Sequence, residues 1–241
     1  MKLGVFISCC VDQFSPETGQ NLIKLLESLG YEADYPMEQT CCGKLLYDNG
    51  KWNDAKALGE KFIDIFNKYD YVIGTSNSCI SYIKTNFGKL FFNSTNHNHY
   101  KTFRNKIMDV SEFLYDIDKT MSFKAIFPYK VYLHTDCHSL RGYNVTKQTR
   151  EILQKVKDIT LLEGNYTDNF CCGYGGTFSI YNPYVSTAMA EQKIKAVLDS
   201  GAEYIVSGDA SCLLHLQSYI NKNNIPLKTI HLIDLLMFNK Q

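Results

Sequence analysis

The sequence predicts an α/β protein built from two similar halves, each with a parallel sheet, that are related by an internal duplication. Segments near the start of the chain recur about 130 residues later in the same order. Within each copy, short β-branched or aromatic stretches alternate with amphipathic stretches of helical spacing, a pattern typical of parallel strands joined by right-handed crossover helices. We therefore expect two Rossmann-like units, one over residues 1–120 and one over residues 130–241.

Each copy is expected to begin with a strand that ends at a cysteine. The sequence "KLGVFISC" (Lys2–Cys9) matches "KVYLHTDC" (Lys130–Cys137). A helix follows in the first copy over Pro16–Gly30, with proline at its start, leucines on one face and glycine at its end. The matching helix begins near Thr146. A short second strand, "YEADYP" in the first copy and "ITLLEG" (Ile159–Gly164) in the second, then leads into a Cys-Cys-Gly loop.

A long helix and a third apolar strand complete each copy. The helices are predicted over Asp54–Asn67 and Pro183–Asp199, and the strands over "YVIGTSNSC" (Tyr71–Cys79) and "YIVSGDASC" (Tyr204–Cys212). Between them, "FFNSTNHNHY" (Phe91–Tyr100) has no periodicity and is predicted to be a polar surface loop rather than a metal site, despite its two histidines. Because parallel strands present their carboxyl ends at one edge of a sheet, the cysteines are expected to converge there.

Composition narrows the function classes. Lysine plus arginine equal aspartate plus glutamate at 25 each in 241 residues, so no net charge points to nucleic acid as a partner. No apolar run approaches the length of a membrane-spanning helix. The first residues lack the features of an export signal. We therefore expect a cytoplasmic protein whose cysteines remain reduced and serve as metal ligands or redox groups rather than as disulfides.

The duplication assigns four of the nine cysteines to each half. The predicted metal ligands are Cys9, Cys41, Cys42 and Cys79 in the first half, and Cys137, Cys171, Cys172 and Cys212 in the second. Cys10 has no matching cysteine in the second half and is predicted to be a small core residue. Four thiolates suit either zinc or a [4Fe-4S] cluster. No Cys-x-x-Cys knuckle is present, and adjacent cysteines diverge in extended backbone, which favours a polynuclear iron–sulfur cluster.

Glycines next to these cysteines are predicted to make room for the cofactor. Gly43 and Gly173 follow the paired cysteines and allow a sharp turn with close approach of the backbone. The second half adds Gly175 and Gly176, a turn that can present backbone N–H groups to an anion or to cluster sulfurs. No dinucleotide fingerprint is present.

The second half also carries more polar groups around its first cysteine, which suggests that substrate chemistry is located there. His138 is a candidate proton donor or acceptor, and Arg141 is a candidate for binding a carboxylate through paired hydrogen bonds. The competing explanation is that the histidine bonds to loop backbone and the arginine caps a helix.

These segments resemble a known family, the cysteine-rich CCG domain proteins, over almost the whole chain. The resemblance rests on "CVDQFSPETG" (Cys10–Gly19), "EQTCCG" (Glu38–Gly43), "HTDCHSLRG" (His134–Gly142), "CCGYGGTFS" (Cys171–Ser179) and "SGDASCL" (Ser207–Leu213). It is strongest to members that serve lactate utilisation. Related members occur in heterodisulfide reductase and as the iron–sulfur subunits of glycolate oxidase.

The resemblance implies an iron–sulfur electron-transfer subunit of an L-lactate dehydrogenase-type oxidoreductase complex, with one or two clusters, [4Fe-4S] in type, per chain. Its partners would be the other subunits of a lactate oxidation complex and a small 2-hydroxy acid, which is oxidised to pyruvate. In the fullest family motif each half ends in Cys-x-x-Cys. Here Ser76 and Asp209 take the first position of that pair and are expected beside the cofactor. Some relatives hold zinc in such a domain, so zinc in one site is the alternative.

Two functions of other classes stay open. One is a zinc-stabilised assembly module whose thiolates only hold loops together. The other is a metal-free thiol–disulfide redox protein that cycles its vicinal cysteines and requires exposed thiols of low pKa.

Overall fold

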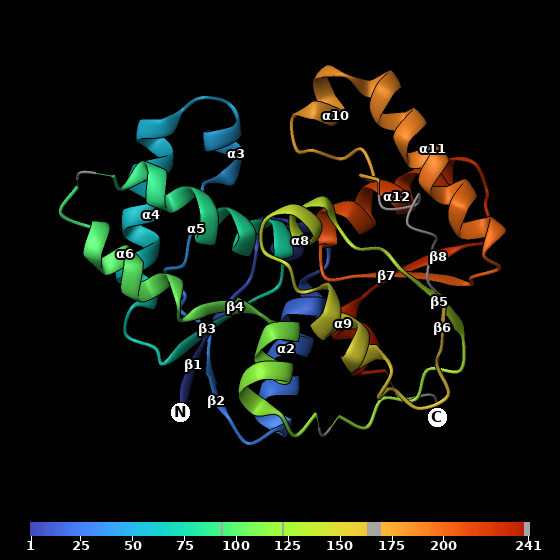
Figure 1. Ribbon diagram of the computed structural model, residues 1–241, viewed down its shortest axis with the longest axis horizontal. Coiled ribbons are helices and arrows are strands. Elements are labelled where there is room, and N and C mark those ends of the chain that lie inside the picture. The colour runs from blue at the N-terminus through green and yellow to red at the C-terminus, as the bar shows by residue number, and fades with distance from the viewer. Residues whose placement is uncertain (93, 122, 163–169, 239–241) are drawn as a thin grey trace.

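Two four-stranded, fully parallel sheets lie side by side in the structure, a computed structural model that describes residues 1–92, 94–121, 123–162 and 170–238 (Figure 1). The strand orders are β2-β1-β3-β4 and β6-β5-β7-β8. The same order in both sheets confirms the predicted α/β fold with two similar parallel-sheet halves. The first sheet contains β1 (Lys2–Phe6), β2 (Glu32–Asp34), β3 (Tyr71–Gly74) and β4 (Ile107–Asp109). The second contains β5 (Lys130–Leu133), β6 (Thr160–Leu162), β7 (Tyr204–Ser207) and β8 (Lys228–His231).

Helices connect the strands in a similar order in both halves. Those of the first half are α1 (Cys9–Phe14), α2 (Pro16–Ser28), α3 (Lys44–Asp48), α4 (Trp52–Phe66), α5 (Asn77–Leu90), α6 (His97–Arg104), α7 (Val110–Glu112) and the π-helix η1 (Phe113–Asp118). Those of the second half are α8 (Cys137–Arg141), α9 (Thr146–Leu153), α10 (Phe178–Tyr181), α11 (Pro183–Asp199), α12 (Ala210–Lys222) and α13 (Leu232–Leu236). The exception to the similar order is α6, between β3 and β4, which has no equivalent in the described part of the second half.

The longer helices confirm the predictions from periodicity. Pro16 occupies the first turn of α2, its buried face includes Leu22 and Leu25, and Gly30 follows the helix with a φ of 88°. In the second half, Pro183 likewise opens α11. The predicted strand Ile159–Gly164 is present as β6, and its last two residues lie outside the described chain.

Three predictions about strand ends and loops were wrong. The first strands do not end at cysteines, because β1 ends at Phe6 and β5 at Leu133, and Cys9 and Cys137 instead open α1 and α8. The third strands do not reach their cysteines, because Ser76 and Asp209 act as N-caps that turn the chain into α5 and α12. Cys79 and Cys212 therefore lie in the first turns of helices rather than at strand ends. The segment Phe91–Tyr100 is not wholly a polar loop, since α6 begins within it and buries Tyr100 in the core.

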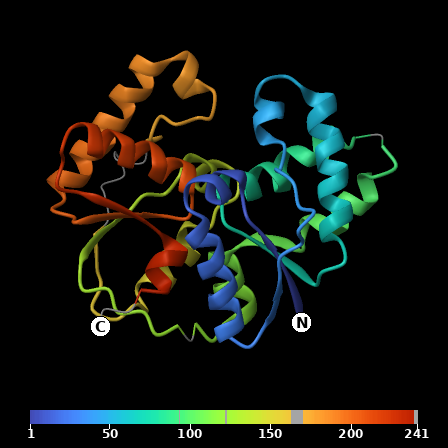
Figure 2. The same ribbon diagram turned by 180° about the vertical axis from the view of Figure 1, so that it is seen from behind.

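The largest apolar core lies between the two sheets and draws residues from both halves. It joins Val5 and Leu22 of the first half to Val131, Leu153 and Leu236 of the second. Helix α2 packs against α13, and α9 packs reciprocally against α7 and η1 (Figure 2). The halves are therefore held together by the same kind of interior that stabilises each sheet. No helix within the described ranges has the length and apolarity needed to cross a membrane.

Candidate metal centre

All eight predicted ligand cysteines line one cavity of about 160 Å³ at the junction of the two halves. The carboxyl ends of both sheets point toward it, as parallel sheets require of a ligand site. The predicted convergence of the cysteines within each half is therefore present. The sequence did not indicate that both sets would face the same space.

In the first half, three different turns place the thiols. Ser8 caps α1 by accepting a hydrogen bond from the N–H of Val11, which sets Cys9 at the start of that helix. Its Sγ lies 3.8 Å from the Sγ of Cys41, in the loop before α3. Cys42 and Cys79 are buried beside them.

The second half repeats this arrangement. Asp136 caps α8 by accepting hydrogen bonds of 3.0 Å from the N–H groups of His138 and Ser139, so Cys137 opens that helix. The Sγ atoms of Cys137 and Cys171 lie 4.0 Å apart. Two thiols bound to one tetrahedral zinc ion would lie about 3.8 Å apart, given bonds of about 2.3 Å. Both pairs thus have the spacing of neighbouring metal ligands.

The glycines after the paired cysteines have left-handed backbone conformations that other residues rarely adopt. Gly43 has a φ of 84° and Gly173 a φ of 94°. A Cβ on Gly173 would lie 2.6 Å from the carbonyl oxygen of Ser186, and a Cβ on Gly43 would lie 3.4 Å from that of Ala55. Each N–H points at the sulfur of the first paired cysteine, at 3.5 Å for Gly43 and 3.4 Å for Gly173.

Hydrogen bonds among the thiols favour one thiolate in each set. Those from Cys42 and Cys9 lower the pKa of Cys41. Those from Cys137 and Cys172 lower the pKa of Cys171. Because the thiolate is the form that binds metal, each set holds a donor that is ready for a metal ion or an iron–sulfur cluster. The donor type, the spacing and the glycine turns together fit such a centre.

Ser76 and Asp209, predicted beside the cofactor, meet each other across the junction and line the cavity. They form an isolated antiparallel bridge, and the Ser76 hydroxyl donates a 2.9 Å hydrogen bond to the Asp209 carboxylate. The N–H groups of Ser78 and Ser211 donate to the same carboxylate. Burial opposes its charge, yet hydrogen bonds from Ser211, Ser78 and Ser76 lower the pKa of Asp209. The pair holds the two halves together at the cavity wall.

The remaining predicted site residues differ in whether they line the cavity. His138, Gly175 and Gly176 line the cavity, and both glycines have positive φ, at 53° and 61°. Arg141 is exposed at the end of α8 and is not among the described residues that form the cavity wall.

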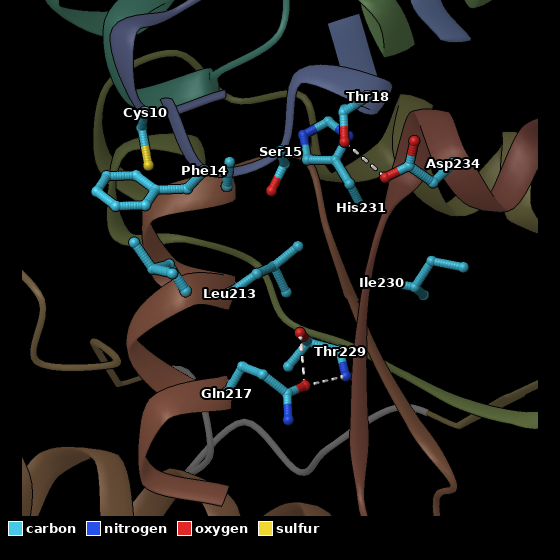
Figure 3. Close-up of a pocket in the computed structure, with 12 residues that line it drawn as sticks. Cys10, Phe14, Ser15, Thr18, Leu213, Gln217, Thr229, Ile230, His231 and Asp234 are labelled. Atoms are coloured by element: carbon cyan, nitrogen blue, oxygen red, sulfur yellow. Dashed lines mark hydrogen bonds between the residues drawn. The ribbon is translucent and has the colours of Figure 1, made fainter. Parts of the chain in front are cut away.

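Sequence reasoning misjudged Cys10, which is not a core residue. Its side chain is partly exposed, and it lines both the shared cavity and a neighbouring cavity of about 300 Å³ between α1 and α12. In the neighbouring cavity Cys10 faces the ring of Phe14, and the hydroxyl of Thr18 donates a 2.7 Å hydrogen bond to Asp234 (Figure 3). Burial raises the pKa of Cys10 to about 12, which keeps this thiol protonated near neutral pH.

His134 was also missed as a site residue. Its side chain is 1% exposed, and one of its ring nitrogens lies within 4.8 Å of the sulfurs of Cys172 and Cys212. Burial lowers its pKa to about 3, so the imidazole is neutral and has a nitrogen lone pair that can bind a metal. The repeat could have indicated His134 as a site residue. It aligns this histidine with an apolar residue, Phe6, and each lies three positions before the first cysteine of its half.

Comparisons with known proteins identify the family of this sequence. The sequence matches the cysteine-rich domain CCG over residues 3–84 and 131–217, and each matched segment contains one complete set of four cysteines. It is 33% identical to lactate utilization protein A 1 of Bacillus mycoides over 98% of this chain and 96% of that protein. It is 31% identical to lactate utilization protein A of Bacillus subtilis over 98% and 99%. Among solved structures, a putative Asp/Glu racemase from Yersinia pestis aligns over 98% of this chain and 96% of its own, with a TM-score of 0.41 and 11% identity.

Proposed function

Because the chain belongs to the cysteine-rich CCG domain family, we propose that it is an iron–sulfur electron-transfer subunit that works in lactate utilisation. It would receive electrons released when partner subunits oxidise L-lactate to pyruvate. The single observation that carries the proposal is that two equivalent sets of four thiols converge on one cavity. Names of relatives aligned over nearly the whole chain supply the metabolic context.

The chain's own residues would hold the centre and shield it from water. Cys42, Cys79, Cys172 and Cys212 are each at most 8% exposed. Cys9, at the rim, is exposed. An iron–sulfur cluster bound by these thiols supplies one-electron transfer. The two-electron oxidation of a 2-hydroxy acid therefore requires another cofactor, such as a flavin on a partner subunit.

We assign two residues to the binding of a small acid or a partner. His138 lies on the cavity wall and can exchange a proton with a group bound there. Arg141 is exposed on the same short helix and can hold the carboxylate of an acid, or an acidic group of a partner, that arrives from outside.

The thiol spacing supports a second candidate, a zinc-stabilised assembly module. Sulfur separations of 3.8 Å and 4.0 Å match two ligands on one tetrahedral ion. Such a protein would be colourless and would unfold when a chelator removes its zinc.

Anaerobic purification followed by iron, acid-labile sulfide and zinc analysis tests the proposal. We expect iron and sulfide in equal amounts and a brown colour that bleaches on reduction. Absence of both from carefully reconstituted protein, with stoichiometric zinc instead, would establish the zinc module. If neither metal is present and thiol counts change reversibly with oxidant, the thiol–disulfide function would replace both.

A further inference from the structure

His134 contacts the second set of thiols from the interior of the protein. It directly follows β5, and its backbone N–H donates a 2.9 Å hydrogen bond to the carbonyl of Val206 in β7. This fixes the side chain at the carboxyl end of the sheet. One ring nitrogen and the sulfurs of Cys172 and Cys212 lie within 4.8 Å of one another, and all three side chains are buried.

The imidazole of His134 has no competing hydrogen-bond partner. Neither Nδ1 nor Nε2 is hydrogen-bonded within the described part of the chain. A buried polar group without a partner costs about 1 to 3 kcal/mol, so such groups call for a ligand or a structural reason. A metal ion between this nitrogen and the two sulfurs would satisfy the lone pair that is otherwise unused.

The first half provides the control within the same molecule. Phe6 aligns with His134 in the duplication and is fully buried in the core cluster that contains Cys42 and Cys79. It stacks edge-on against Phe62 at a centroid distance of 4.8 Å. The backbone path therefore does not require a polar residue at this position. The second half therefore has a buried imidazole next to its cysteine sulfurs where the first half has a phenyl ring.

We propose that His134 is a metal ligand in the second half, which makes that centre a mixed imidazole–thiolate site while the first is bound by thiolates alone. The inference rests on the proposed function only in requiring that a metal centre occupy the second half. It applies to a cluster iron and to a zinc ion alike, because imidazole nitrogen binds both.

Mixed ligation would make the two centres unequal. When the imidazole takes the place of one of the four thiolates, the centre carries one negative charge less, and replacing thiolate by histidine raises the reduction potential of iron–sulfur centres. In an electron-transfer chain, the second half would then be the better electron acceptor. If the metal is zinc, which takes four ligands, His134 and three of the four cysteines would form a site of the Cys₃His type.

Cobalt(II), used alone as a probe, tests the ligand without dependence on iron loading. The full chain carries Cys41→Ser and Cys42→Ser so that only the second half binds, and its histidines are labelled with ¹⁵N. We expect one strongly shifted, exchangeable imidazole N–H proton in the NMR spectrum, coupled to ¹⁵N. His134→Phe, which copies the residue of the first half, should remove this signal and weaken cobalt affinity at least tenfold.

His138→Phe is the matched control, because it alters the histidine four residues further along, in α8, and should leave the shifted signal in place. The inference is overturned if the background protein shows no shifted N–H proton, if cobalt(II) does not bind, or if the signal persists in His134→Phe. The first measurement needs no substitution at His134, so a folding defect in that variant cannot hide the answer. Absence of iron and sulfide would defeat the proposed function yet leave the cobalt result unaffected.

Discussion

The two halves follow the same chain path and present the same thiols, but they differ in what supports those thiols. In the first half, Phe6 and Phe62 fill the space with a stacked aromatic pair. In the second, His134 aligns with Phe6, and burial together with the charge of the buried Lys193 lowers the pKa of the histidine. The comparison shows that the duplicated fold requires a large buried side chain at this position but does not require that it be apolar. A polar side chain can therefore be used there for chemistry.

The largest expected effect comes from separating the two centres. Cys41→Ser and Cys171→Ser should each abolish the metal of its own half and leave the other half loaded, because the sulfur of each lies beside a cysteine sulfur of its own half. Metal per chain, measured after anaerobic reconstitution, should fall by the content of one centre. If either substitution empties both halves, the shared cavity holds a single centre and the comparison between two sites fails.

The next effect concerns proton transfer and compares His138 with its counterpart Cys10. Loss of a group that moves a proton in the reaction costs roughly 100-fold or more in rate, so His138→Asn should lower kcat/KM for lactate-driven electron transfer by that factor. Cys10→Ser should change it little, because the pKa of about 12 keeps that thiol protonated. If both substitutions lower kcat/KM by the same factor, the two halves contribute equally to proton transfer and this comparison fails.

A third comparison uses the glycine turns. Gly173→Ala should reduce the free energy of unfolding by roughly 2 to 4 kcal/mol, from the left-handed backbone and the contact with Ser186. Gly43→Ala should cost less, since its Cβ would meet the nearest atom at 3.4 Å. Gly201→Ala, at a φ of 76° with no atom within 4 Å, isolates the backbone contribution. Urea unfolding would reject this ordering if Gly43 proved the more sensitive site.

The smallest expected effect concerns the pH dependence of stability. It compares Asp109 and His231, the last residues of β4 and β8. Burial raises the pKa of Asp109 to about 6, so its contribution to stability is full below about pH 4 and is lost as the pH rises through 6. Burial lowers the pKa of His231, so its contribution is lost as the pH falls instead. Asp109→Asn should therefore gain roughly 2 to 3 kcal/mol relative to the unsubstituted protein between pH 4 and pH 7.

Urea unfolding of both proteins at each pH gives this difference directly. The pH dependence of metal binding cancels, because the two proteins have the same thiols. If the difference in the free energy of unfolding between the two proteins does not change with pH, the pKa of Asp109 is not raised in the folded protein.

The sequence alone predicted the duplication, the parallel sheets, the main helices and the eight cysteines, because these depend on periodicity and on spacing along the chain. It missed the early ends of the third strands, where the capping residues Ser76 and Asp209 overrode the apolar pattern. It also missed the shared cavity and the orientation of His134. The cavity depends on how the halves pack against each other. The position of His134 depends on the pairing of β5 with β7, which brings it close to Cys172 and Cys212. No local pattern encodes either arrangement.

The reciprocal packing of α2 on α13 and of α9 on α7 and η1 has the geometry of an isologous interface in a two-fold symmetric homodimer. In a true homodimer any substitution appears on both sides, so Phe6 could not face one centre while histidine faces the other. Joining the two copies in a single polypeptide removes that constraint. The continuous chain is therefore what permits one symmetric scaffold to carry two inequivalent centres, each open to independent selection.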